Sequence, residues 1–429
     1  MSKAASPLGQ TPDGAKTENG FSARRPRRFA LLLTTLLTGN MAISLVWGSV
    51  LSLLMSTQIE RIDPASKVAN LALVSAVGAA VSVVVQPIWG TLSDRTRTRI
   101  GKRSPFLILG GLLGGFALIL LGTSNALIWI ALSWCAVQLF VNMSQAPLQA
   151  VIPDRVPARL RGTTSTVMGL GMVVGSLIGS FYGAAFIAAN ALMAGYVVLA
   201  GILLLTMVLF VLVNPESSNR EEPRDAFRFG RFLRGFWINP LRHPDFFWAF
   251  MARMTLLLGY FGVALYQLYI LQDYIGLGTG AAAVVPIIAV ASLGGSVVSM
   301  LICGPLSDRI GRRKPFVFIS TLVLGIALLI PFALPTSAGM VLFGLVSGFG
   351  VGCYTAVDNA LITEVLPKQE NAGKDLGIAN IANAVPQIAA PAIAGLIVTL
   401  TGGYQGLFLV ALVLTVVGAL CVIPIRKVR

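Results

Sequence analysis

The chain has 429 residues, of which 55% are hydrophobic and 11% are charged, and its formal net charge is +15. Soluble domains carry about 25% charged residues, so this composition excludes an ordinary soluble protein and indicates one embedded in a bilayer. The sequence contains no phosphate-binding loop, metal-ligand cluster or nucleophilic triad, so we predict no enzyme, cofactor or metal ion.

The chain begins with a polar stretch and continues as a series of apolar ones. Residues 1–28 are rich in Ser, Gly, Pro and Arg, which predicts a disordered tail. Apolar stretches of about 20 residues, long enough to cross a bilayer as helices, follow. They predict an all-α membrane protein with twelve spans, at residues 29–56, 69–91, 105–123, 126–151, 164–189, 192–213, 247–272, 282–304, 315–333, 338–363, 377–400 and 405–425.

The arrangement of these spans follows from the polar segments between them. A long polar segment, 214–246, separates six spans from six, so we predict bundles at 29–213 and 247–429 joined by a linker. With the N-terminus in the cytoplasm, 29 of the 32 Lys and Arg residues fall on that side. Because cytoplasmic loops carry the cations of membrane proteins, both termini are predicted to be cytoplasmic, and the positive charge indicates topology, not a nucleic-acid partner.

A charged sequence occurs twice, about half the chain apart. The stretch "GTLSDRTRTRIGKRSP" begins at Gly90, and "GPLSDRIGRRKP" begins at Gly304. Once residues 96–99 are removed, the copies align at an offset of 210 residues, which also pairs Asp154 with Glu364. Agreement between two separate loops predicts two parallel repeats of six helices each. Parallel repeats are a known construction of membrane transporters.

These loops resemble the signature of the major facilitator superfamily, a Gly-x-x-x-Asp-Arg-x-Gly-Arg-Arg sequence between helices 2 and 3 with an echo between helices 8 and 9. The longer first copy resembles the branch of sucrose and glycoside symporters. The resemblance implies that the loop aspartate bridges to the other bundle and closes the cytoplasmic side, although the loop could instead serve only as a topological anchor. The matching residues are Gly90, Asp94, Arg95, Gly101, Lys102 and Arg103, and Gly304, Asp308, Arg309, Gly311, Arg312 and Arg313.

Polar residues inside the spans recur at helical spacing, and such residues mark pathways through membrane proteins. Four of the five polar faces fall on spans 1, 4, 7 and 10, which line the central cavity in the resembled superfamily. We therefore treat them as candidate substrate-binding residues, with hydrogen bonding between helices as the alternative. They are Asn40, Ser44, Trp47, Gln138, Asn142, Gln145, Gln149, Tyr260, Gln267, Tyr354, Asn380, Asn383 and Gln387; Ser347 shares the face of span 10.

Ionisable residues are rarer still within the spans. Asp358 is the only acid well inside a span, and Arg253 is the only base. A carboxyl between a low-dielectric surrounding and a nearby cation is suited to taking up and releasing a proton. Asp358 is thus the candidate for proton coupling, with Arg253 as its possible partner. The alternative is a static ion pair.

These observations predict a transporter that works by alternating access in the inner (plasma) membrane as a monomer. The preferred function is proton-coupled uptake of a sugar or glycoside, because amide and aromatic groups suit a neutral, hydroxyl-rich ligand. Proton-driven efflux of a drug or natural product is one alternative. A receptor or scaffold without transport activity is another.

Overall fold

The computed structural model describes residues 26–157, 160–218, 244–365 and 372–425. In this part of the chain the regular elements are helices, and twelve of them are long and apolar enough to cross a membrane. The predicted all-α membrane fold is therefore confirmed. Residues 1–25 of the predicted tail and 219–243 of the predicted linker lie outside the described residues.

The first six spans form the N-terminal bundle. Helix α1 continues through a π-helical turn, η1, directly into α2, so that these three elements form one span. Within the bundle, α1 packs against α6, and α4 packs against both α5 and α7. The elements are α1 (Pro26–Ser49), η1 (Val50–Leu54), α2 (Met55–Ile62), α3 (Lys67–Arg95), α4 (Ser104–Thr123), α5 (Leu127–Arg155), α6 (Arg161–Ala188) and α7 (Leu192–Val213).

The remaining spans form the C-terminal bundle, in which α11 packs against α13 and α9 packs against α15. Its first span also contains a π-helical turn, η3, which ends that span, whereas η1 lies inside the first span and is followed by α2. The elements are α9 (Pro244–Leu265), α10 (Gln267–Tyr269), η3 (Ile270–Tyr274), η4 (Gly278–Gly280), α11 (Ala281–Ile310), α12 (Lys314–Ala333), α13 (Ser337–Val365), α14 (Ala372–Thr401) and α15 (Gln405–Val422).

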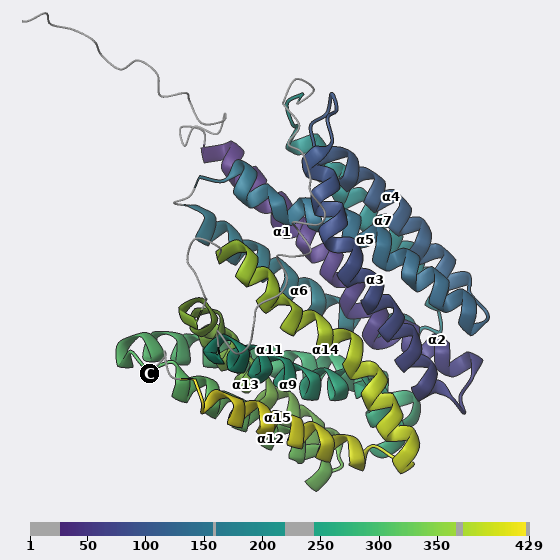
Figure 1. The fold of residues 1–429 in the computed structure, drawn as a ribbon. Helices are drawn as coiled ribbons and strands as arrows, with labels where there is room; N and C mark the ends of the chain where they lie inside the picture. The colour runs from purple at the N-terminus through teal and green to yellow at the C-terminus, as the bar shows by residue number, and fades with distance from the viewer. Residues whose placement is uncertain (1–25, 158–159, 219–243, 366–371, 426–429) are drawn as a thin grey trace, which may run out of the picture.

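The two bundles meet along two pairs of helices, α3 with α14 and α6 with α11. Figure 1 shows the bundles approaching each other at the end that carries α2 and diverging toward the end where α1 begins. We call the first the closed end. The second is the basic end, because the repeated cationic loops after α3 and α11 lie there.

Glycines in the stretch "GLGMVVGSLIG", at residues 169–179, allow α6 to approach α1 closely. A Cβ atom on Gly171 would lie 2.6 Å from the carbonyl oxygen of Leu37, and one on Gly179 would lie 2.6 Å from that of Leu45. No side chain fits at such distances. At these two positions, small residues let the helix backbones come together.

The helices extend further at the basic end than the apolar stretches that predicted them. Helix α3 ends at Arg95, four residues past the predicted span, and α11 ends at Ile310, six residues past it. Hydropathy marks only the part of a helix that faces hydrocarbon, whereas the backbone hydrogen bonding continues into the polar zone. The predicted span 247–272 is in turn interrupted at Tyr266, where α9 ends and α10 begins.

Candidate functional site

A cavity of about 660 Å³ lies between the two bundles, within the size range of sites for small molecules. Its walls come from α1, η1, α3, α5 and α6 on one side and from α9, α10, α11 and α14 on the other. Six of the candidate substrate-binding residues line it: Trp47, Gln138, Asn142, Gln145, Gln267 and Gln387. The structure thus brings together polar residues that are up to 340 positions apart in the chain.

Hydrogen bonds hold part of this polar wall in a fixed arrangement. Trp47 Nε1 donates to Gln145 Oε1 at 3.3 Å, which links α1 to α5. Asn142 Nδ2 donates to the Gln138 carbonyl oxygen at 2.7 Å and to Ser82 Oγ at 3.1 Å, which links α5 to α3. These bonds therefore connect three helices of one bundle, α1, α3 and α5.

Other candidate residues lie away from this cavity. Asn40 and Ser44 are buried in α1, before the lining residue Trp47, and they do not line the cavity. Asn40 Nδ2 donates to the Leu36 carbonyl oxygen at 2.8 Å. Gln149 is exposed, one turn beyond Gln145, because the polar face of α5 continues past the region that the cavity occupies. Of the remaining candidates, Tyr260 and Asn383 are half-buried, Tyr354 and Ser347 are buried, and the side chain of Asn380 lies outside the described residues.

Several residues of the cavity wall were not among the candidates. On α3 these are Ser75, Ser82 and Gln86, and on α6 they are Ser176 and Ser180. The spacing of seven and four residues on α3, and of four on α6, is the same helical signal that identified the face of span 4. Serines in long apolar helices are common, so this signal is weaker for α3 and α6 than for a row of amides.

The only ionisable pair buried deep within the spans of the described chain joins α9 to α13. Arg253 Nε donates to Asp358 Oδ2 at 2.7 Å, and Nη2 contacts the same oxygen. Both side chains are at most 6% exposed. Neither lines the cavity. Their neighbours along α9 and α13, Leu256, Tyr354 and Val357, belong to an apolar cluster of the C-terminal bundle. The predicted face of Arg253, Tyr260 and Gln267 is divided, since the turn at Tyr266 changes the helical phase.

Polar contacts join the two bundles at the closed end. Lys67 Nζ of α3 lies 2.8 Å from Glu60 in its own bundle and 2.7 Å from Asp273 in the other. Gln272 Nε2 donates to Glu60 at 2.9 Å, and Tyr269 donates to the Ser56 carbonyl oxygen at 2.8 Å. We call these five side chains, with the Ser56 carbonyl, the latch. None was a candidate from the sequence, because single polar residues near span ends are ordinary.

A second hollow, of about 960 Å³, lies at the closed end on the other side of the latch. Its wall includes Glu60, Asp273 and Arg61, whose Nη2 donates to Asn190 at 2.8 Å. The hollow is wider than the central cavity. However, its charged side chains already have partners, since Glu60 and Asp273 contact Lys67 and Arg61 contacts Asn190. We therefore interpret it as a vestibule, and we place the candidate site in the central cavity.

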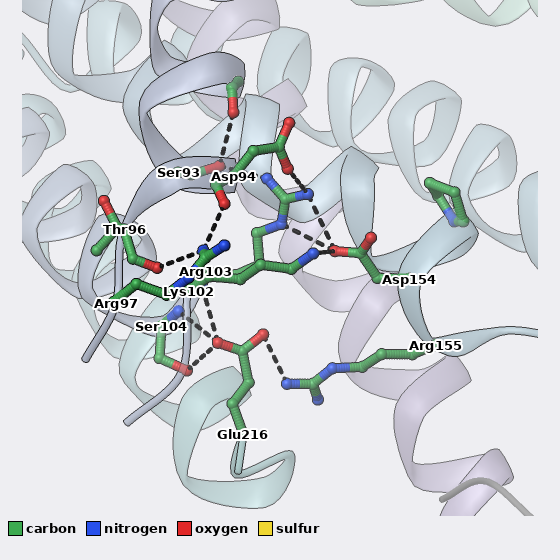
Figure 2. Close-up of polar contacts among 12 residues, drawn as sticks. Ser93, Asp94, Thr96, Arg97, Lys102, Arg103, Ser104, Asp154, Arg155 and Glu216 are labelled. Carbon is green, nitrogen blue, oxygen red and sulfur yellow. Dashed lines mark hydrogen bonds and ion pairs between the residues drawn. The ribbon is translucent and has the colours of Figure 1, made fainter. Parts of the chain in front are cut away.

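A network of charges ties together the loop after α3 at the basic end (Figure 2). Arg103 is buried, and it contacts Asp94 and Ser93 of α3 while its Nε donates to Asp154 of α5 at 3.0 Å. Lys102 also lies 3.0 Å from Asp154. The described partner of Asp94 is thus in its own bundle, and the contact with the other bundle that the family resemblance implies stays a prediction for another state.

Glu216 completes this network, although the sequence interpretation did not select it. Its Oε2 accepts hydrogen bonds from the backbone N–H groups of Arg103 and Ser104, at 2.8 and 3.1 Å. Its Oε1 lies 2.8 Å from Arg155. Because unpaired N–H groups at the start of α4 favour an acceptor, Glu216 caps that helix and fixes the start of the linker against the loop.

The glycines of the two loops have conformations that explain their place in the repeat. Gly101 has a φ of 89° and Gly311 a φ of 64°, values that other residues rarely adopt. The α11 helix ends at Ile310, just before Gly311. Of the remaining residues of these loops, Arg309 and Arg312 are exposed, Gly90, Arg95, Gly304 and Arg313 are half-buried, and the side chain of Asp308 lies outside the described residues.

Comparison with known proteins places the chain in a family. A model described as Major Facilitator Superfamily matches residues 29–302 and 287–429. A general alpha-glucoside permease of Schizosaccharomyces pombe is 27% identical over 183 residues, and the sucrose transport protein SUC3 of Arabidopsis thaliana is 27% identical over 130 residues. These matches cover 37% and 25% of this chain, and the chain spans only 32% and 22% of the relatives' lengths.

A solved structure shares the architecture at low sequence identity. A bacterial homologue of the human lysosomal transporter Spinster, in an inward-facing and occupied conformation, superposes with a TM-score of 0.71 at 15% identity. The superposition covers 95% of this chain and 98% of that one. It supports the fold alone. The family model, whose two matches together extend over residues 29–429, shows that the protein belongs to the Major Facilitator Superfamily.

Proposed function

We propose that the protein takes up a sugar or glycoside by alternating access, coupled to protons. The observation that carries this proposal is the central cavity, whose described lining residues include amides and hydroxyls but no charged side chain. Uncharged hydrogen-bonding groups match a ligand that is rich in hydroxyls and carries no charge. Two relatives, named as an alpha-glucoside permease and a sucrose transport protein, support this substrate class.

The latch and the divergence of the bundles support alternating access. The contacts of the latch join the bundles at one end of the cavity, and a state that is open at that end must break them. An ion pair that forms in one conformation and not in the other biases the equilibrium between them. The distribution of Lys and Arg favours a basic end that faces the cytoplasm of a plasma membrane, with both termini inside. In that orientation the state described here is open inward. We propose separately that the protein acts as a monomer.

The buried Arg253–Asp358 pair supports proton coupling. An acid that is almost fully removed from water and held by one cation changes its proton affinity when the distance to that cation changes. Movement of α9 against α13 during the cycle would alter that distance. Coupling to a proton therefore needs no further ionisable group in the cavity.

The proposal is tested with the full chain in proteoliposomes. An imposed pH gradient, acidic outside, should drive accumulation of labelled glucosides above the equilibrium level, and a protonophore should abolish it. Substrate-induced alkalinisation of the external medium should accompany uptake. The opposite result, in which the same gradient expels an apolar compound and no glucoside accumulates, would establish efflux. Binding of a glucoside without any movement would indicate a receptor.

A further inference from the structure

The two walls of the central cavity differ in chemistry. The N-terminal bundle contributes fifteen lining residues, of which nine are Ser, Asn or Gln. The C-terminal bundle contributes eight, of which only Gln267 and Gln387 are polar, and its other lining residues include Phe261, Leu265 and Val285. A ligand whose surface is polar all round would leave hydroxyls against an apolar wall. The asymmetry therefore indicates a ligand with two different faces.

The polar wall contains groups that the protein itself does not satisfy. Ser75 Oγ and Trp134 Nε1 are buried and have no hydrogen-bond partner among the described residues, although both residues line the cavity. Their residues are 4% and 0% exposed. A buried polar atom without a partner is costly. Trp134 Nε1 faces Gly78 of α3, on which a Cβ atom would lie only 2.2 Å away, so Ser75 Oγ is the group of the two whose missing bond a ligand or an ordered water can supply. A third such atom, Gln267 Nε2, lies on the opposite wall, so two of the three unsatisfied atoms that the described residues place at the cavity belong to the N-terminal bundle.

Trp47, the half-buried tryptophan of this wall, also suits a sugar ring, whereas Trp134 is fully buried and supports Trp47 from behind. Trp47 and Trp134 meet edge to face with ring centroids 5.9 Å apart, and Trp47 is oriented by its bond to Gln145. Sugar rings have hydroxyls at their edges and C–H groups on their faces. An arrangement of amides beside an aromatic surface offers a partner for each.

We propose that the preferred ligand is a neutral glycoside with an apolar aglycone, and not a free sugar or a disaccharide. Its sugar ring lies against α3 and α5, and its aglycone lies against Phe261, Leu265 and Val285. This inference rests on the proposed function, and it narrows the substrate class. A phosphorylated sugar finds no cation among the described lining residues, and a nucleoside would place the polar edge of its base against the apolar wall.

The test measures affinity in a series in which only the aglycone grows. The full chain is placed in lipid nanodiscs, and methyl, ethyl, propyl, butyl and phenyl glucosides are titrated beside glucose, sucrose, maltose and uridine. Each methylene transferred to an apolar wall should tighten binding about fourfold, so butyl glucoside should bind roughly 50-fold better than methyl glucoside. Empty nanodiscs correct for partition of the glucosides into lipid.

Two variants test whether the dependence of affinity on aglycone length comes from the apolar wall of the C-terminal bundle. Leu265→Ser should flatten the dependence on chain length, so that butyl glucoside loses most of its advantage over methyl glucoside. The matched control is Leu301→Ser, which makes the same substitution on the outer surface of α11, where the side chain is 72% exposed. It should retain the full gradient.

The possible results separate this inference from the proposed function. Sucrose or maltose binding more tightly than butyl glucoside, or equal affinities along the series, would overturn the amphipathic ligand and leave sugar transport standing. Preferred binding of uridine would overturn both, as would absence of binding by every sugar and glucoside. An unchanged gradient in Leu265→Ser would contradict the placement of the aglycone even if the series behaves as expected.

Discussion

Replacing the buried pair of Arg253 and Asp358, singly and together, tests whether it carries protons or only joins two helices. The side chains are 6% and 4% exposed, so loss of one partner leaves the other charge unpaired and away from water. Such a loss costs about 3–5 kcal/mol of unfolding free energy. Asp358→Asn and Arg253→Met should each lose about this amount. The double variant Arg253→Met with Asp358→Leu should recover most of it, because apolar replacement of a buried ion pair is often neutral.

Two measurements on the same preparations complete this test. Unfolding by sodium dodecyl sulfate in mixed micelles gives the stability cycle, and proteoliposomes give both glucoside accumulation under a pH gradient and glucoside exchange without one. The double variant should be stable and should exchange, yet it should not accumulate. Accumulation by a stable double variant would refute a coupling role and leave a static ion pair. Single-variant losses below about 1 kcal/mol would instead contradict the burial on which the reasoning depends.

Three further predictions concern single positions. Asp94→Asn should slow transport at least tenfold while glucoside affinity stays within twofold, as measured by initial rates beside binding; wild-type turnover would exclude a gating role. Gln145→Leu should weaken binding about 5–150-fold, from about 1–3 kcal/mol for an unpaired ligand hydroxyl, whereas Gln149→Leu, outside the cavity, should bind normally; equal effects would contradict the position of the cavity. Lys67→Met should shift the equilibrium toward opening at the closed end about 5–30-fold, since its two partly exposed ion pairs together contribute about 1–2 kcal/mol. A cysteine introduced by Thr57→Cys should then react faster with an impermeant thiol reagent. An unchanged rate would show that the latch does not hold this end closed.

Features that repeat along the chain could be predicted from the sequence. Twelve spans and two copies of the loop at Gly90 and Gly304 follow from periodicity and identity, and the structure has both. The amides Gln138, Asn142 and Gln145 share a face by helical phase alone, and the structure places all three at the cavity. The pairing of Arg253 with Asp358 could be predicted because these are the only base and the only acid well inside the predicted spans.

Features that depend on how the bundles sit against each other could not be predicted. Lys67 and Asp273 are 206 residues apart, and their contact exists only because the bundles approach at one end. Phase likewise gives the direction of a side chain and not its depth, so it could not distinguish Gln145, at the cavity, from the exposed Gln149. Glu216 was missed for a related reason, since its partners are backbone N–H groups of another helix.

The π-helical turns η1 and η3 have a consequence for how the latch tolerates change. Each such turn holds one residue more than an α-helical turn, which rotates everything after the insertion by about 100°. Ser56 and Glu60 follow the first turn, and Gln272 and Asp273 lie in the second. Deleting one residue from the first turn would therefore rotate Ser56 and Glu60 away from their partners in the other bundle while preserving both residues. At this end of the molecule, closure therefore depends on the number of residues in the turn, and a deletion there should disturb the latch more than a substitution.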